Sequence, residues 1–389
     1  MNNKPNFIIL WAGGFPHKIS ASGNKFFHMA KAAHKEGFNS ILLNKVSVID
    51  CEKREESQSQ GIIEGIKYYF LHRRRKNNIL SKIIAEVISN FRLMFKLREL
   101  SISGSRSVLI VSYSPLFLIF YYKLIAWLLR YRFVISIMEY HPELGLKKLG
   151  RINAYLFWKV AFFVADGAIP ISRFLSEQIR RQNAHLPLFE VPVLADFNHK
   201  GFTAKSFQIP AFFLYCGSVG YFDVIKLVVD AYLGLEKDDI ELHLVISGKE
   251  SQIKKLKNLI SNHHNIKLYQ KLSYDELYSK YAGATGLLIP MRSNQQDLAR
   301  FPQKIAEYAA SGSPIITNPV GEIDRFFKGN VNAVFADGYS VEAYKNSMLW
   351  ILNNPDKAKL IGRNGKTTGF RYFHFESIEK PFADFLKAI

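Results

Sequence analysis

Short apolar runs alternate with helical patterns along the chain. Near the N-terminus, the apolar run 7–12 leads into Gly13 and Gly14, and a helical pattern over about 23–37 precedes a second apolar run at 39–46. Strand, glycine loop, helix and strand in this order are typical of the βαβ unit of a parallel sheet. Further strands are expected in this half at 107–113, 132–138, 164–172 and 188–193. These elements predict one doubly wound domain.

A second βα series follows the segment 196–211, which is polar, contains glycine and proline, and is expected to be a linker. Its strands are predicted at 212–218, 242–248, 265–270, 286–290 and 313–318, with helices between them. The tail from Ser340 is predicted to be helical, with a break near 353–355. The expected fold class is α/β, with Rossmann-like domains at 1–200 and 210–370 facing across a ligand cleft.

The composition fits a globular protein with more than one domain. The chain has 389 residues, of which 48% are apolar and 22% charged. The two cysteines, Cys51 and Cys216, have no metal or redox spacing around them and fit a reducing compartment. The N-terminal residues lack the order of a signal peptide, so a cytoplasmic protein is expected.

The charge is strongly basic, with 52 basic and 33 acidic residues and a net charge of +19. Such an excess of positive charge favours a negatively charged partner. Three candidates are nucleic acid, an anionic bilayer and a phosphorylated substrate. The sequence contains no zinc spacing or RNA-binding motif, and nucleic acid is therefore not an expected partner.

The block 301–323, FPQKIAEYAASGSPIITNPVGEI, resembles the donor-site signature of family 4 glycosyltransferases of the GT-B fold. Weaker blocks at 13–39, 137–145, 164–172 and 213–218 follow in the order that the family shows. The resemblance implies an N-terminal acceptor domain, a C-terminal nucleotide-sugar domain, and a final helix, 371–389, that crosses back to the first domain. It also implies transfer with retention of configuration.

The resemblance assigns a donor site to the second half. No metal is expected, because helix N-termini and basic side chains can neutralise the departing diphosphate. Glu307 matches the glutamate that grips the ribose hydroxyls; the alternative is a solvated glutamate paired with Lys304. The other donor-binding residues implied are Gly217, Ser218, Arg300, Phe301 and Lys304. No cofactor is expected, and a UDP-sugar is weakly favoured over a GDP-sugar as substrate.

The sequence departs from the family pattern at two places. Where the family has a sugar-contacting glutamate, this chain has Ala299. Asp297 is a candidate substitute, although it could instead cap the next helix. The residues after Gly217 include neither of the two basic residues that many family members carry there, so positive charge is expected from Arg300 and Lys304.

Glu139 and His141 follow a predicted strand at the edge where ligands bind, and they match the family's acidic-x-His segment. The resemblance places the histidine near the transferred sugar, and the alternative is a structural histidine. Gly13 and Gly14 are expected in an acceptor or diphosphate loop, because glycine lets a ligand approach the backbone closely.

Two segments are candidates for membrane contact. Residues 72–100 form a basic amphipathic pattern, headed by the basic cluster 73–76, that suits an anionic bilayer surface. The alternative is a domain helix whose apolar stripe faces the sheet. The run 115–129 is too short to span a bilayer, which takes about 20 residues, and is expected to be a buried helix whose aromatic residues could also reach the interface.

The function expected is sugar transfer from a nucleotide sugar to a saccharide acceptor, lipid-linked and used in surface polysaccharide assembly at the inner face of the cytoplasmic membrane. Two alternatives stay open. One is a nucleotide-sugar epimerase of the same fold. The other is a non-catalytic protein that binds nucleic acid or anionic lipid through its charge.

Overall fold

The computed structural model describes residues 4–13, 15, 20–48, 59–74, 78–101, 106–141, 148–202 and 210–389. Gly14, Cys51, Arg75 and Lys76 fall outside these ranges, as do the side chains of Arg73 and Arg74. The chain forms two compact units, one of residues 1–194 with 375–389, and one of residues 195–374. The expected boundaries lay at 200/210 and 370/371, close to these positions.

The first unit is built on a seven-stranded sheet in the order β3-β4-β2-β1-β5-β6-β7, and only the β3–β4 pair is antiparallel. Strands β1, β5 and β6 are apolar at nearly every position, as expected for parallel strands covered on both faces. The strands are β1 (Asn6–Trp11), β2 (Asn39–Val48), β3 (Gln60–Ile63), β4 (Ile66–Arg74), β5 (Val108–Ser112), β6 (Arg132–Ile137) and β7 (Gly167–Pro170).

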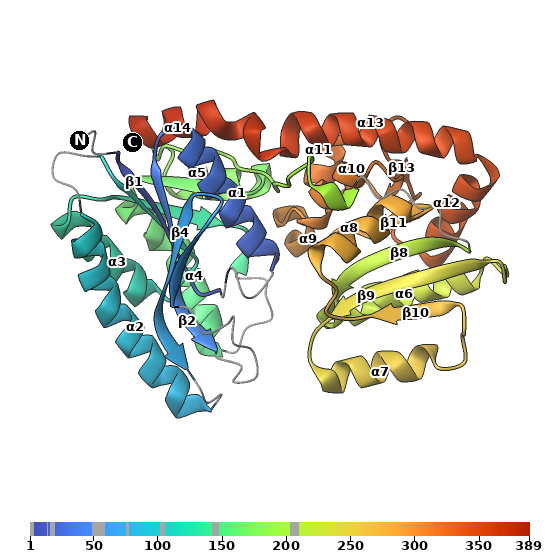
Figure 1. Ribbon diagram of the computed structural model, residues 1–389, viewed down its shortest axis with the longest axis horizontal. Coiled ribbons are helices and arrows are strands. Elements are labelled where there is room, and N and C mark those ends of the chain that lie inside the picture. The colour runs from blue at the N-terminus through green and yellow to red at the C-terminus, as the bar shows by residue number, and fades with distance from the viewer. Residues whose placement is uncertain are drawn as a thin grey trace. The chain divides into compact units, whose positions relative to one another are not determined.

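Helices lie on both faces of this sheet (Figure 1). The right-handed crossovers that join its parallel strands place α2, α3 and α4 on one face and α1 on the other. The last helix packs beside α1 and against β1, where the Phe382 ring lies 5.6 Å from that of Phe7. The helices are α1 (Ala21–Lys35), α2 (Ile79–Leu100), α3 (Leu116–Leu128), α4 (Lys148–Val164), α5 (Arg173–Gln182) and α14 (Glu379–Ala388).

Two elements of the first unit differ from expectation. The β3–β4 hairpin was not predicted; its turn is made by Glu64 and Gly65, both with positive φ. The strand predicted at 188–193 is wrong as a regular strand. This segment forms an isolated bridge between Leu188 and Ala168, because Pro187 and Pro192 cannot donate to a ladder.

The second unit holds a six-stranded parallel sheet in the order β10-β9-β8-β11-β12-β13. The strands are β8 (Ala211–Ser218), β9 (Ile240–Ser247), β10 (Ile266–Tyr269), β11 (Gly286–Ile289), β12 (Ile315–Thr317) and β13 (Val334–Phe335). The helices are α6 (Phe222–Leu233), α7 (Glu250–Ile260), α8 (Tyr274–Gly283), α9 (Gln295–Ala299), α10 (Lys304–Ser311), α11 (Glu322–Phe326), α12 (Val341–Asn353) and α13 (Pro355–Phe373). The helix expected from Ser273 is confirmed, and a capping box of Ser273 and Glu276 explains its start.

The apolar stripe of α2 faces away from the sheet. Phe91 is 60% exposed and Val87 is 65% exposed, whereas Ser89 and Leu93 are buried. The interpretation that this stripe packs on the sheet is therefore wrong for most of its residues. Helix α3 is likewise only half buried, with Phe117 70% exposed, so the expectation of a buried helix is also wrong. Within the described residues, no helix is both long enough and apolar enough to cross a membrane.

Candidate functional site

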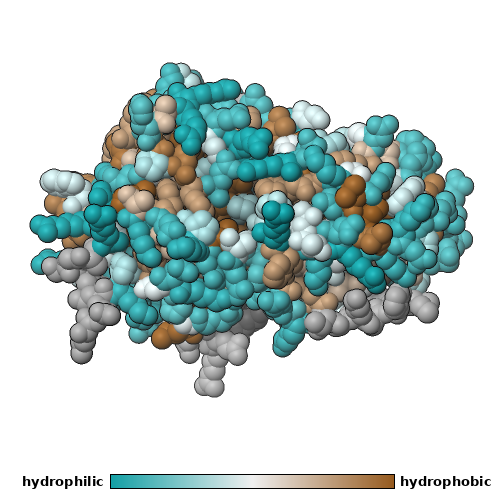
Figure 2. All heavy atoms as spheres, turned by 90° about the horizontal axis from the view of Figure 1, so that it is seen from above, coloured by the Kyte–Doolittle hydropathy of each residue, from teal (hydrophilic) through white to brown (hydrophobic). Residues whose placement is uncertain are grey.

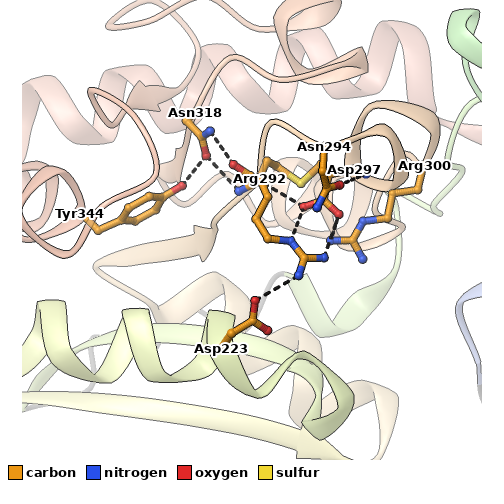
Figure 3. Close-up of polar contacts among 8 residues, drawn as sticks. Asp223, Arg292, Asn294, Asp297, Arg300, Asn318 and Tyr344 are labelled. Carbon is orange, nitrogen blue, oxygen red and sulfur yellow. Dashed lines mark hydrogen bonds and ion pairs between the residues drawn. The ribbon is translucent and has the colours of Figure 1, made fainter. Parts of the chain in front are cut away.

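The carboxyl ends of β8, β11 and β12 in the second unit bring together three segments that are far apart in the sequence (Figure 3). Ligands bind outside the carboxyl ends of strands in open parallel sheets. Asn318, after β12, accepts from the Met291 backbone N–H at 2.9 Å and donates to the Met291 carbonyl at 2.6 Å. The Tyr344 hydroxyl donates to the same Asn318 Oδ1 at 2.7 Å. These bonds fix the loop that follows β11.

Arg292 lies in this loop and is held by a buried carboxylate. Asp297, in α9, is completely buried, and its Oδ2 accepts from the Arg292 backbone N–H at 2.8 Å and from Arg292 Nε at 3.1 Å. The other oxygen of Asp297, Oδ1, accepts from Arg292 Nη2 at 3.2 Å and pairs with Arg300 Nη2 at 3.0 Å. One carboxylate thus orients two guanidinium groups, and the Asp297 hydrogen bond is the main cause that raises the pKa of Arg292.

The two arginines share an aromatic surface. The guanidinium carbon of Arg300 lies 4.5 Å from the centre of the Tyr221 ring, and that of Arg292 lies 5.6 Å from it. Arg292 Nη1 also donates to Asp223 at 3.0 Å, and the Asp223 side chain is 61% exposed. Arg300 Nε is buried and has no hydrogen-bond partner. A buried donor without a partner costs free energy.

Glu307 is buried within α10, with 6% of its surface exposed. The alternative of a solvated helix glutamate is therefore wrong. Burial raises the pKa of the nearby Cys216 thiol, while the positive charge of Lys304 lowers it and the negative charge of Glu307 raises it. Lys304 and Glu307 thus both lie near Cys216, at the end of β8.

The other predicted donor residues have visible structural roles. The Phe301 ring is buried between Phe326 and Phe373, at 5.7 and 5.4 Å, so only its backbone is available to a ligand. A Cβ at Gly217 would lie 2.6 Å from the Tyr215 ring, which explains the glycine. Ser218 is exposed, and its hydroxyl accepts from the Gly220 N–H at 3.2 Å.

A separate pocket of about 170 Å³ opens at the carboxyl ends of β1 and β5 in the first unit. Lys45 lines it and is buried, with its ammonium group paired with Glu86 and donating to the Tyr122 hydroxyl at 2.8 Å. Tyr113 also lines it, and its hydroxyl accepts from Asn153 at 3.0 Å. The pocket is therefore lined by the Lys45–Glu86 ion pair and by the Tyr113 and Tyr122 rings, which suit hydrogen bonding and stacking with a sugar.

His141 lies behind this wall. Its ring stacks on that of Tyr113, with the centroids 3.4 Å apart and the planes 11° apart. Burial lowers the pKa of His141 to about 4, although its hydrogen bond with the Glu139 backbone opposes the shift. The imidazole is therefore neutral near pH 7 and suits hydrogen bonding rather than charge stabilisation.

The loop after β1 is described only in part, and Gly14 lies outside the described residues. A Cβ at Gly13 would lie 1.8 Å from the Trp11 ring, so the glycine makes room for this indole. Its contact with a ligand stays a prediction. The structure brings His141 close to the first-unit pocket, and it brings Asp297, Arg300, Lys304 and Glu307 to one edge of the second unit.

The sequence interpretation missed Arg292 as a site residue. Its position three residues past the end of β11 at Ile289 was the available signal, because side chains at carboxyl ends of parallel strands meet at one edge. Its pairing with Asp297 could not be foreseen, since the pairing depends on the turn between the two residues. Among the described residues, no group of three or more His, Cys, Asp or Glu is placed to hold a metal ion.

The second-unit residues described above lie within a segment that is similar to known proteins. Residues 202–368 match the family model described as glycosyl transferases group 1. An uncharacterized glycosyltransferase of Methanocaldococcus jannaschii is 23% identical over 234 residues, which cover 59% of this chain and 62% of the relative. The alignment thus spans less than two thirds of that relative's length.

Solved structures agree with this fold over both units. Sucrose-phosphate synthase from Thermosynechococcus elongatus superimposes with a TM-score of 0.76 at 13% identity, covering 99% of each chain. HepE from Anabaena in complex with UDP-glucose gives a TM-score of 0.70 at 11% identity, covering 99% of this chain and 100% of the other. Residues 202–368 are thus similar to the group 1 glycosyl transferase domain, within a chain that has the GT-B fold.

Proposed function

We propose that the chain transfers a sugar from a nucleoside diphosphate sugar to a hydroxyl of a saccharide acceptor. The observation that carries this proposal is the arginine pair held by buried Asp297 at the carboxyl edge of the second sheet. Arg292 and Arg300 supply the positive charge that the segment after Gly217 lacks, and Lys304 adds to it at the start of α10. Such preorganised charge stabilises a diphosphate as it departs.

The donor occupies the second unit in this proposal. Glu307 binds the ribose hydroxyls through its carboxylate, and the two guanidiniums bind the diphosphate oxygens. Asp297 is buried and already engaged by both arginines, so we assign it a positioning role in place of direct sugar contact. A UDP-sugar is favoured, because the structural relative HepE is solved with UDP-glucose.

The reaction proposed is attack by the acceptor hydroxyl on the anomeric carbon from the face that the diphosphate leaves. The bond between the anomeric carbon and the phosphate oxygen breaks, and the new glycosidic bond forms on the same face, with retention. The hydroxyl proton passes to the departing phosphate oxygen. The acceptor binds in the first-unit pocket, with Lys45 beside it. Neutral His141, which stacks on Tyr113 outside the pocket lining, supports the transferred sugar through a hydrogen bond.

The acceptor proposed is a saccharide on an anionic lipid carrier, used in surface polysaccharide assembly at the inner face of the cytoplasmic membrane. The support is the basic net charge of the chain. A nucleotide-sugar epimerase of the same fold is the rival enzyme. It would turn over the donor without any acceptor.

Product analysis tests the proposal and separates the two enzymes. The protein is incubated with UDP-, GDP- and ADP-sugars, with and without a lipid-linked saccharide pool, and nucleotide release and sugar products are followed by chromatography. Nucleoside diphosphate released in proportion to a glycosylated acceptor supports transfer. Conversion of the donor sugar in the absence of acceptor supports the epimerase, and no turnover of any nucleotide sugar contradicts both.

Replacing His141 by Ala is expected to lower kcat much more than it changes the KM for the donor. An interaction made mainly in the transition state has this kinetic signature. Since the pKa of His141 is about 4, its titration should add no inflection to the kcat profile between about pH 6 and 8. Steady-state kinetics over this range check both points.

The control for this variant is Tyr113→Phe, which keeps the ring stacked on His141 and removes only the hydroxyl. A His141→Ala protein with near-parental kcat would make the histidine structural. If the kcat profile of the parent has an inflection between about pH 6 and 8 that is absent from His141→Ala, His141 titrates in this range and is not neutral throughout it.

A further inference from the structure

Three neighbouring helices of the first unit expose large apolar side chains on the side away from the sheet. Figure 2 shows another face, on which hydrophilic side chains predominate. On these three helices, the large apolar residues that point to solvent are 43% to 82% exposed. It comprises Leu80, Ile83, Ile84, Val87, Phe91 and Phe95 on α2, Phe117, Phe120, Leu124, Trp127 and Leu128 on α3, and Leu149, Ile152, Tyr155, Leu156 and Phe163 on α4. We call this set the apolar face.

The apolar face is continuous because the three helices are joined side by side. The Tyr121 hydroxyl of α3 donates to the Asn90 carbonyl of α2 at 2.9 Å. The Leu116 N–H of α3 donates to Asn153 of α4 at 2.9 Å. Monomeric soluble proteins rarely expose contiguous apolar patches larger than a few hundred Å². A face made by three adjacent helices therefore indicates a docking surface.

The charges around this face select its partner. The three helices carry eight basic and two acidic residues. Both acidic residues have basic partners, since Glu86 pairs with Lys45 and Glu99 with Lys96, and Lys123 on α3 pairs with Asp166. Lys82 on α2 and Lys148 and Lys159 on α4 are exposed. An apolar face rich in aromatic residues and rimmed by basic groups suits the interface of an anionic bilayer.

We propose that the apolar face docks on an anionic lipid bilayer, with Trp127 and its neighbours entering the headgroup region. A second copy of the chain fits less well, because a symmetric dimer would bring the same basic rims together. The pocket of the first unit adjoins this surface, since Glu86 of α2 and Tyr122 of α3 line it. Docking would thus present the pocket to a saccharide carried by a lipid, a point that rests on the proposed function.

Vesicle flotation with matched triple variants tests the docking. The face variant carries Phe91→Glu, Phe117→Glu and Trp127→Glu, at positions 60% to 70% exposed. The control carries Val331→Glu, Val341→Glu and Leu360→Glu, which are exposed on the second unit. Both lower the net charge by the same amount. Vesicles of phosphatidylcholine, with and without one third phosphatidylglycerol, are the probe, and thermal unfolding checks that each variant is folded.

We expect the parent and the control variant to bind the anionic vesicles and the face variant to bind at least about a hundredfold more weakly. Equal binding by the two variants would overturn the proposal, as would a parent that ignores anionic vesicles. A parent dimer in sedimentation that the face variant dissociates, without vesicle binding, would assign the face to a second copy instead. Nucleotide binding is measured on the same proteins, so that failure of docking and failure of the proposed donor site are seen separately.

Discussion

A Glu307→Ala variant is expected to lose measurable sugar transfer and to bind the donor nucleotide roughly tenfold to a hundredfold more weakly. A charge-assisted hydrogen bond contributes about 1.5–3 kcal/mol, and about 1.4 kcal/mol corresponds to a factor of ten in affinity. Glu307 is 6% exposed, so a ligand that reaches it is largely desolvated and the bond is not screened by water. Calorimetric titration with the nucleoside diphosphate measures the change.

Because Glu307 is buried, its replacement also tests a purely structural role. Glu307→Gln keeps the shape of the side chain and removes its charge, and it should fold like the parent while still binding the donor more weakly. If thermal stability falls in Glu307→Ala but donor affinity stays at the parental value in both variants, the glutamate supports the helix and does not bind ribose.

An Asp297→Asn variant is expected to unfold more easily and to lose donor affinity at the same time. Asp297 is completely buried and pairs with Arg292 and Arg300, and removing one partner of a buried ion pair costs roughly 3–5 kcal/mol. The arginine side chains are 23% and 16% exposed, so part of this cost will be recovered through water. Chemical unfolding gives the stability change.

Two further variants separate stability from binding. Arg292→Gln removes one phosphate-binding cation and should weaken donor binding about tenfold. Asp223→Asn removes only the exposed partner of Arg292 and should bind the donor at least as well as the parent, because this carboxylate competes with the diphosphate for the guanidinium. If Arg292→Gln binds the donor like the parent, the cluster serves the fold alone.

The sequence predicted most strands of both sheets, because buried parallel strands such as 108–112 and 286–289 are continuous apolar runs. It missed the strand Ile66–Arg74, whose last three residues, 72–74, were included in a basic helical pattern that starts at residue 72. The periodicity of residues 79–100 also predicted an apolar stripe on this helix, but it did not show which way the stripe faces. A helical pattern shows that a stripe exists, and tertiary packing decides whether it faces the sheet or the solvent.

The candidate site was predictable to a similar extent. The block 301–323 located Lys304 and Glu307, because a local pattern carries both residues. It could not reveal that Asp297 is enclosed by Arg292 and Arg300, which depends on how the loop after β11 turns back on itself. The sequence itself shows that no basic residue directly follows Gly217. The proposed role of Arg292 in supplying this positive charge became visible only in the folded chain.

Comparing the binding of nucleotide sugars with that of a nucleic acid tests the proposed function most directly. Binding of UDP-glucose, GDP-mannose and a short single-stranded DNA is measured by calorimetry on the parent and on Glu307→Gln, near physiological salt and at higher salt. We expect saturable binding of one nucleotide sugar at a single site, weakened by Glu307→Gln and kept at higher salt. Tight DNA binding that salt abolishes, with no affinity for any nucleotide sugar, would contradict it and favour a non-catalytic polyanion-binding protein.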